Sequence, residues 1–121
     1  MRPTLLLTAF AAALLAATAA GAHPKPRAAT PLPDAELTAG PPLISITFSE
    51  GLVAAFSGLE LDDAAGKAQA LGPLVIGGAD KKTMSAPVKA HLAPGTYTVN
   101  WHAVGDDTHH VTGHYSFQVK P

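Results

Sequence analysis

Cysteine is absent from this chain of 121 residues, and charged and aromatic side chains are few. The lack of cysteine excludes disulfides, thiolate metal sites and catalysis by a thiol. A formal net charge of −1 gives no reason to expect a nucleic acid or an anionic membrane as a partner. Beyond the first 22 residues no apolar run is long enough to cross a bilayer, so we expect a product that is not embedded in a membrane.

The first 22 residues have the pattern of a secretory signal peptide. One positive charge at Arg2 precedes a nearly continuous apolar run, and small residues occupy the −3 and −1 positions of a cut after Ala22. We therefore expect residues 1–22 to be removed. Residues 23–121 then form the mature protein, which has the length of one domain.

Three segments alternate apolar and polar residues with a period of two, which is the pattern of a strand with one buried face. They read LISITFSE at 43–50, TYTVNWHAV at 96–104 and GHYSFQVK at 113–120. The residues expected to face inward are Ile44, Ile46 and Phe48 in the first segment, Tyr97, Val99, Trp101 and Ala103 in the second, and Tyr115, Phe117 and Val119 in the third.

The rest of the mature chain also favours strands. Six prolines between positions 24 and 42 forbid helix and favour an edge strand or an arm on the surface. Shorter apolar segments follow, bounded by turn residues such as Asp63-Ala64-Ala65-Gly66. No segment keeps a helical period. About seven short strands in about 100 residues predict an all-β fold, a two-sheet antiparallel sandwich.

The stretch GDDTHHVTGH at 105–114 contains three of the six histidines beside two aspartates. In an extended segment, residues two apart face the same way, so Asp107 and His109 can address one point while His110 faces away. A carboxylate and an imidazole at this spacing make half of a metal site. In a turn between two strands, however, such residues are more often solvated. His110 and His114 are too far apart along a strand to share an ion and are interpreted as surface residues.

His23 becomes the first residue of the mature chain if the cut follows Ala22. Its α-amino group and its imidazole can chelate one metal ion together, although a fraying N-terminus would leave it without a role. Two nitrogens from His23, one from His109 and an oxygen from Asp107 form a set that suits Cu(II).

Four stretches together resemble the CopC-type family of periplasmic copper-binding proteins: HPKP at 23–26, FSEGLVAAFSGLEL at 48–61, GTYTVNWHAV at 95–104 and DDTHHVTGHYSFQVK at 106–120. The resemblance covers nearly all of the mature chain. It implies an immunoglobulin-like Greek-key β-sandwich at 23–121 that binds and delivers copper without catalysis. It also implies that His23, Asp107 and His109 are ligands and that Glu50 lies close to the same ion. A solvated charge at a strand end is the alternative for Glu50.

The function that this resemblance implies is a chaperone or buffer for Cu(II) in a bacterial periplasm, in copper homeostasis or resistance. The chain would hold one Cu(II) ion. Its partners would be the copper ion and an inner-membrane copper transporter or a periplasmic copper oxidase.

Two features depart from the family pattern. Many members bind Cu(I) in a methionine-rich loop with a histidine, expected near DDAAGKAQALGPL at 62–74, where this chain has neither residue. Only Met84 remains after the leader is removed, so one chain cannot assemble a thioether site. His110 stands where the family usually has proline, and we expect its side chain to point away from the ion.

Two other functions remain open. An N-terminal histidine that chelates copper also resembles lytic polysaccharide monooxygenases. The short chain, the few aromatic residues left outside the core and a carboxylate ligand, which disfavours Cu(I), argue against such an oxidative enzyme. The third possibility is a metal-free sandwich module with histidines on its surface.

Overall fold

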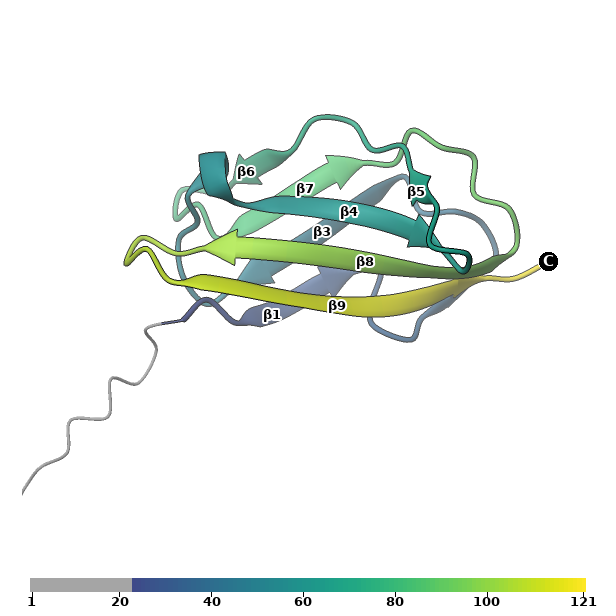
Figure 1. Cartoon of the computed structure of the whole chain (residues 1–121), viewed down its shortest axis with the longest axis horizontal. Coiled ribbons are helices and arrows are strands. Elements are labelled where there is room, and N and C mark those ends of the chain that lie inside the picture. Colours follow the sequence, from purple (N-terminus) through teal and green to yellow (C-terminus); the bar gives the residue numbers. More distant parts are fainter. Residues whose placement is uncertain (1–22) are drawn as a thin grey trace, which may run out of the picture.

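The computed structural model describes residues 23–121, and the expected signal peptide, residues 1–22, lies outside the described residues. Two β-sheets pack face to face (Figure 1) in the orders β1-β3-β7-β6 and β2-β9-β8-β4-β5. The elements are β1 (Pro26–Thr30), β2 (Glu36–Leu37), β3 (Leu43–Phe48), the 3-10 helix η1 (Ala54–Phe56), β4 (Gly58–Asp63), β5 (Ala68–Gln69), β6 (Val75–Gly77), β7 (Thr83–Pro87), β8 (Gly95–Val104) and β9 (His110–Val119).

The predicted sandwich is confirmed, with two differences. The described residues form nine strands rather than about seven, because β2 and β5 are only two residues long and too short to show a period. β2 pairs in parallel with β9, so the sandwich is not antiparallel throughout. The proline-rich segment supplies β1 at the edge of its sheet, where missing backbone N–H donors are tolerated.

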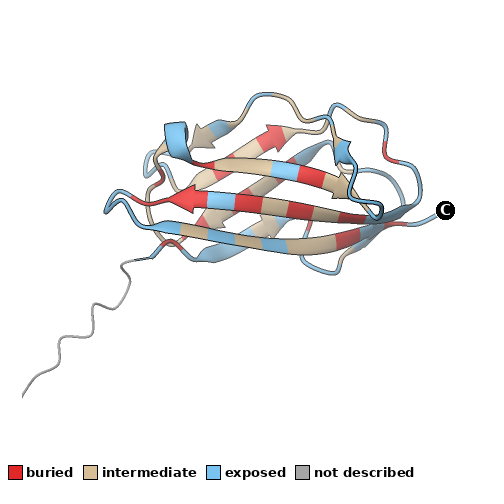
Figure 2. Cartoon of the chain, in the orientation of Figure 1, coloured by how far each residue is buried: buried red, intermediate tan, exposed pale blue. Residues whose placement is uncertain are grey.

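The buried faces of the long strands match the predicted ones. On β3 and β8 the predicted inward residues are buried, and the burial bands alternate along β8 in Figure 2. On β9, Phe117 and Val119 are buried, while Tyr115 is only partly buried. The alternation therefore gave the correct face for all three strands.

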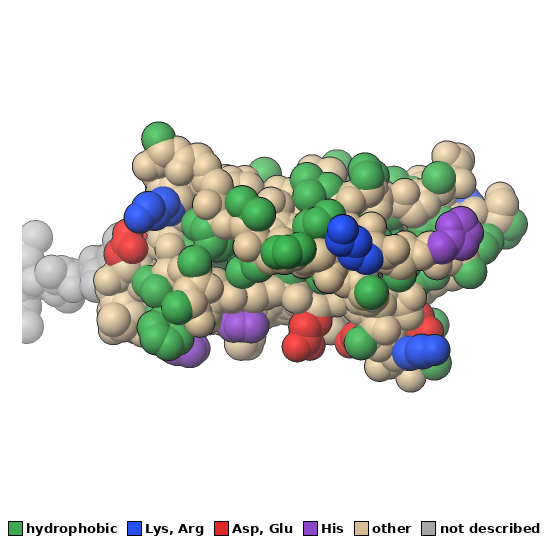
Figure 3. All heavy atoms as spheres, turned by 90° about the horizontal axis from the view of Figure 1, so that it is seen from above, with side chains coloured by type: hydrophobic (Ala, Val, Ile, Leu, Met, Phe, Trp, Pro, Cys, Tyr) green, Lys and Arg blue, Asp and Glu red, His purple; other side chains and the backbone are tan. Residues whose placement is uncertain are grey.

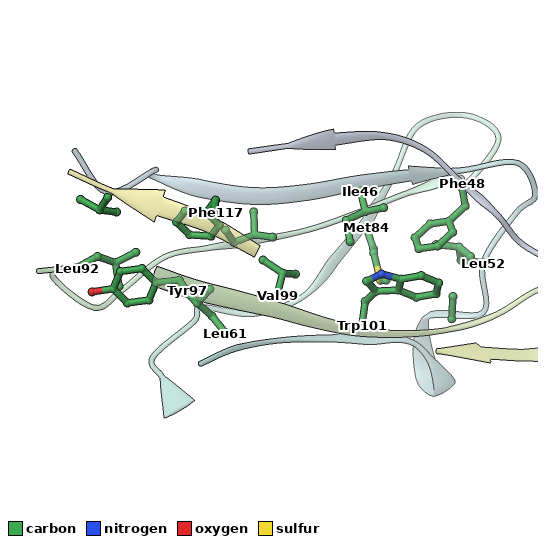
Figure 4. Close-up of a cluster of buried hydrophobic side chains, with 13 residues drawn as sticks. Ile46, Phe48, Leu52, Leu61, Met84, Leu92, Tyr97, Val99, Trp101 and Phe117 are labelled. Atoms are coloured by element: carbon green, nitrogen blue, oxygen red, sulfur yellow. The ribbon is translucent and has the colours of Figure 1, made fainter. Parts of the chain in front are cut away.

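Two aromatic pairs form part of the core between the sheets (Figure 4). Phe48 and Trp101 meet edge to face with ring centroids 5.1 Å apart, and Tyr97 stacks on Phe117 at 5.7 Å. Trp101 also covers Gly113, where an added Cβ would lie 2.3 Å from the indole ring. Since Phe48 ends β3 and Trp101 lies near the end of β8, this packing supports the strand ends that lead into the candidate site.

Hydrogen bonds join the segment after β3 to the end of β8. The Val53 N–H donates to the Val104 carbonyl at 2.8 Å, and the Val104 N–H donates to Ser57 Oγ at 3.1 Å. Leu52 and Gly105 form an isolated antiparallel bridge. These contacts hold the residues that follow β3 beside the turn between β8 and β9.

Candidate metal centre

Segments far apart in the sequence meet at one end of the sandwich, the left end in Figure 1. They are the residues before β1, the residues after β3 and the turn between β8 and β9. They carry the three predicted ligands, His23, Asp107 and His109, and Glu50, which was predicted to lie close to the ion; we call these four residues the ligand cluster.

Asp107 and His109 meet within the β8–β9 turn. His109 Nδ1 lies 2.7 Å from Asp107 Oδ2, and the His109 backbone N–H donates to Asp107 Oδ1 at 3.2 Å. Thr108 between them has φ of 68°, a left-handed conformation that is uncommon for a β-branched residue. The prediction that the two side chains meet is confirmed, but the extended backbone on which it relied is wrong, because the chain turns here.

The hydrogen bond between the two side chains affects the charge of the site. It holds the pKa of Asp107 below its ordinary value of 3.8. Both side chains remain open to solvent, with exposed fractions of 36% for Asp107 and 49% for His109. Asp107 is therefore anionic at neutral pH and accessible to a cation.

His23 lies against the same turn. Its ring meets the His109 ring edge to face, with centroids 4.5 Å apart and an interplanar angle of 74°. His23 is exposed, whereas the next side chain, Pro24, is fully buried. The Lys25 N–H donates to Ser49 Oγ at 2.9 Å, and the Ser49 N–H donates to the Lys25 carbonyl at 2.8 Å. The start of the described chain is thus anchored beside the β8–β9 turn.

Glu50 reaches the cluster over Gly105. A Cβ added to Gly105 would lie 3.0 Å from Glu50 Oε2, 3.1 Å from Asp107 Oδ1 and 3.4 Å from Pro24 Cδ. Two carboxylates and the Pro24 ring therefore converge on one glycine. The missing side chain at this position is what allows that approach.

His110 and His114 lie on β9 outside the turn. His110 opens the strand opposite Val104, and His114 lies opposite Asn100. Both are exposed. Their placement agrees with the prediction that they are surface residues on a common strand.

Within residues 23–121, no three His, Asp or Glu side chains are arranged closely enough to hold a metal ion as they stand. The ligand cluster instead meets in two pairs, His23 with His109 and His109 with Asp107, while the Glu50 and Asp107 carboxylates both lie near Gly105. Side-chain rotation would be needed to aim these groups at one point. Two imidazoles and two carboxylates are nitrogen and oxygen donors of the kind that suits Cu(II).

Sequence reasoning missed the residues that support the cluster. Pro24, Ser49 and Gly105 hold it through burial, backbone pairing and close approach. A glycine directly before two aspartates was the one local signal for a close contact. The position of Pro24 could not be read from the sequence, because its burial depends on segments that are distant in the chain.

Comparisons with known proteins assign the family. A family model described as the CopC domain matches residues 27–120. Copper resistance protein C of Pseudomonas syringae pv. tomato is 41% identical over an alignment of 122 positions, and the alignment covers 97% of this chain and 96% of that protein. The chain therefore belongs to the CopC family.

Solved structures agree with this assignment. PcoC from Escherichia coli, described as a methionine-rich copper resistance protein, matches with a TM-score of 0.71 and 37% identity over 81% of this chain and 99% of that chain. CopC from Methylosinus trichosporium OB3b matches with a TM-score of 0.72 and 29% identity over 82% of this chain and 95% of that chain. Both support the β-sandwich fold.

The description of PcoC as methionine-rich contrasts with this chain. Beyond Met1, its one methionine is Met84 on β7, which is 0% exposed and packed in the core. Met84 therefore does not present its sulfur at the surface.

Proposed function

We propose that this protein binds one Cu(II) ion at the ligand cluster and acts as a copper chaperone or buffer in the periplasm. Membership of the CopC family and the contacts of His109 with His23 and with Asp107 support this proposal. The observation that carries it is the contact between the His23 and His109 rings, because it joins residues 86 positions apart at 4.5 Å. Residues 1–22 would be the signal peptide and residues 23–121 the mature copper-binding domain.

Each member of the cluster has a chemical role in this proposal. His23 would supply its imidazole and, after removal of the leader, its α-amino group. His109 would supply an imidazole nitrogen and Asp107 a carboxylate oxygen, which completes a nitrogen-rich set suited to Cu(II). Glu50 would add negative charge close to the ion and lower the electrostatic cost of bringing a divalent cation to the site.

The exposure of the site favours transfer of copper over permanent retention. His23, Asp107 and His109 are all exposed at one end of the molecule, where a partner could reach them. An inner-membrane copper transporter or a periplasmic copper oxidase is the kind of partner we propose. On the face shown in Figure 3, side chains of both charge signs are scattered and no basic patch forms, which gives no support for nucleic acid as a partner.

Binding without catalysis is the function that the described surface supports best. Among residues 23–121, Phe56 is the one exposed aromatic side chain, at 60% exposure. A single phenyl ring offers little surface for stacking a polysaccharide. In the described part of the chain, no helix is long and apolar enough to cross a membrane.

Two histidine variants test the proposal. We expect His109→Ala to weaken Cu(II) binding by more than about tenfold, because a ligand is lost. His110→Ala is the matched control, since it removes a neighbouring exposed imidazole, and it should change affinity by less than about threefold, within the effect of an ordinary surface change. Affinity is measured by competition with a chelator of known strength at pH 7. Equal losses in the two variants would contradict the ligand assignment.

A further inference from the structure

Pro24 is the buried residue at an otherwise exposed chain start. His23 before it and Lys25 after it are exposed, yet the Pro24 side chain is fully buried. Its Cδ would lie 3.4 Å from a Cβ at Gly105, so the ring packs beside the strand end that leads into the Asp107–His109 turn. A chain start in solution normally frays, and burial of its second mature residue opposes that.

Two further restraints act next to Pro24. Lys25 exchanges two hydrogen bonds with Ser49, one through the Lys25 N–H and one through the Lys25 carbonyl. Proline itself restricts the residue before it to extended conformations, which limits the backbone of His23. Few torsions therefore separate the anchored Pro24 ring from the imidazole that meets His109.

We propose that Pro24 is a positioning residue for the copper site. Its buried ring holds the mature N-terminus beside His109, so that the chelate is ordered before the metal arrives. This inference rests on the proposed copper function. Without the anchor, metal binding would have to order about one further residue, and the associated loss of backbone entropy corresponds to about tenfold in affinity.

Proline at this position also removes a competing ligand. Cu(II) can displace the proton of a backbone amide next to a free N-terminus, and Pro24 has no amide proton to lose. Replacement of Pro24 introduces that amide, which would obscure a change in Cu(II) affinity. Zn(II) is the better probe, because it accepts imidazole and carboxylate ligands without displacing amide protons near neutral pH.

The test compares Pro24→Gly with Pro26→Gly in the mature chain that starts at His23. Pro26 is an exposed proline at the start of β1 and so serves as the matched control. We expect Zn(II) affinity to fall about tenfold in Pro24→Gly and by less than about threefold in Pro26→Gly. Pro24→Ala, which keeps part of the buried side chain, should lie between the native chain and Pro24→Gly and serves if the glycine variant does not fold.

A second form of the protein separates positioning from general stability. With His23 replaced by alanine and the α-amino group acetylated, neither nitrogen of the chelate remains, so Pro24→Gly should cost little further affinity in that background. An equal loss of Zn(II) affinity in both backgrounds would overturn the inference, as would equal Zn(II) affinities of Pro24→Gly and Pro26→Gly. If the native chain still binds Cu(II), either result leaves the proposed function standing. Failure of the native mature chain to bind Cu(II) would instead refute the proposed function.

Discussion

At the scale of single residues, Gly105 decides how closely the carboxylates of the site approach. A Cβ there would lie 3.0 Å from Glu50 Oε2 and 3.1 Å from Asp107 Oδ1, so both side chains would have to shift. We predict that Gly105→Ala folds but binds Cu(II) about tenfold more weakly, because the groups near the ion are displaced. Gly77→Ala is the control, since a Cβ there meets nothing within 4 Å. Unchanged Cu(II) affinity in Gly105→Ala would show that this close approach is not needed.

The pKa of Asp107 gives a second residue-scale prediction for the metal-free protein. The hydrogen bond from His109 lowers this pKa below 3.8 in the folded state. The lowered pKa stabilises the folded state, and this stabilisation is fully present at pH values above the unfolded-state pKa. That stabilisation is lost as the pH falls through the folded-state pKa. We expect His109→Ala to raise the pKa of Asp107 toward 3.8 and His110→Ala to leave it unchanged, as read from the carboxyl carbon shift in NMR. An unchanged Asp107 titration in His109→Ala would contradict this.

Residue spacing predicted part of the site and missed the rest for a physical reason. Asp107 and His109 are close in sequence, so a short-range rule could pair them even though Thr108 bends the chain. The prediction that His23 joins them came from the expected cleavage point and from the family resemblance, not from residue spacing. Gly105 and Pro24 act through contacts across the fold, which no local pattern contains.

At the scale of elements, strand alternation predicted the buried faces because each long strand has one face on the core. The same rule could not detect β2, which is two residues long and is defined by parallel pairing with β9. The turn at Asp63 was predictable for another reason. Asp63 Oδ1 accepts backbone N–H groups of Ala65 and Lys67, each at 2.9 Å, and Gly66 has φ of 81°.

Two tyrosines in neighbouring strands should respond in opposite ways to removal of the hydroxyl. The Tyr97 hydroxyl donates to the Ala93 carbonyl at 2.6 Å, whereas the Tyr115 hydroxyl is buried with no hydrogen-bond partner among the described residues. Burial raises the pKa of Tyr115 to about 12. We expect Tyr97→Phe to lower the free energy of unfolding by about 1 kcal/mol, and Tyr115→Phe to leave it unchanged or raise it by up to about 1 kcal/mol.

Urea unfolding of the metal-free variants measures both changes. Each variant serves as the control for the other, since both remove one hydroxyl from a strand of the same sheet. A Tyr115→Phe variant that is as destabilised as Tyr97→Phe would mean that the Tyr115 hydroxyl has a stabilising partner.

At the scale of the whole molecule, the position of Met84 limits the metal chemistry. Its side chain is fully buried between the sheets, and it is the one methionine among residues 23–121. We predict one tight Cu(II) site per chain and no Cu(I) site with thioether ligands. Met84→Leu, which conserves volume, should leave copper binding unchanged. A second tight site in a titration, or sulfur ligands seen by X-ray absorption of the Cu(I)-loaded protein, would refute this prediction.

The sandwich as a whole brings the two parts of the site together. His23 lies before the first strand, and the Asp107–His109 turn joins the last two, yet the His23 and His109 rings meet at 4.5 Å. The central claim is that removal of the leader creates an α-amino ligand at this place. Acetylation of the His23 α-amino group keeps every side chain and blocks only that amine, without supplying a new one.

The most direct measurement therefore compares Cu(II) binding by the chain that starts at His23 and by the same chain acetylated at the His23 α-amino group. Because the α-amino group has an ordinary pKa of about 7.7–8.0 and imidazole about 6.5, affinity of the native chain should fall as pH decreases through this range. At pH 7 the acetylated chain should bind Cu(II) markedly more weakly, with fewer nitrogen couplings in its electron paramagnetic resonance spectrum. Equal affinity and identical spectra for the two chains would contradict the account.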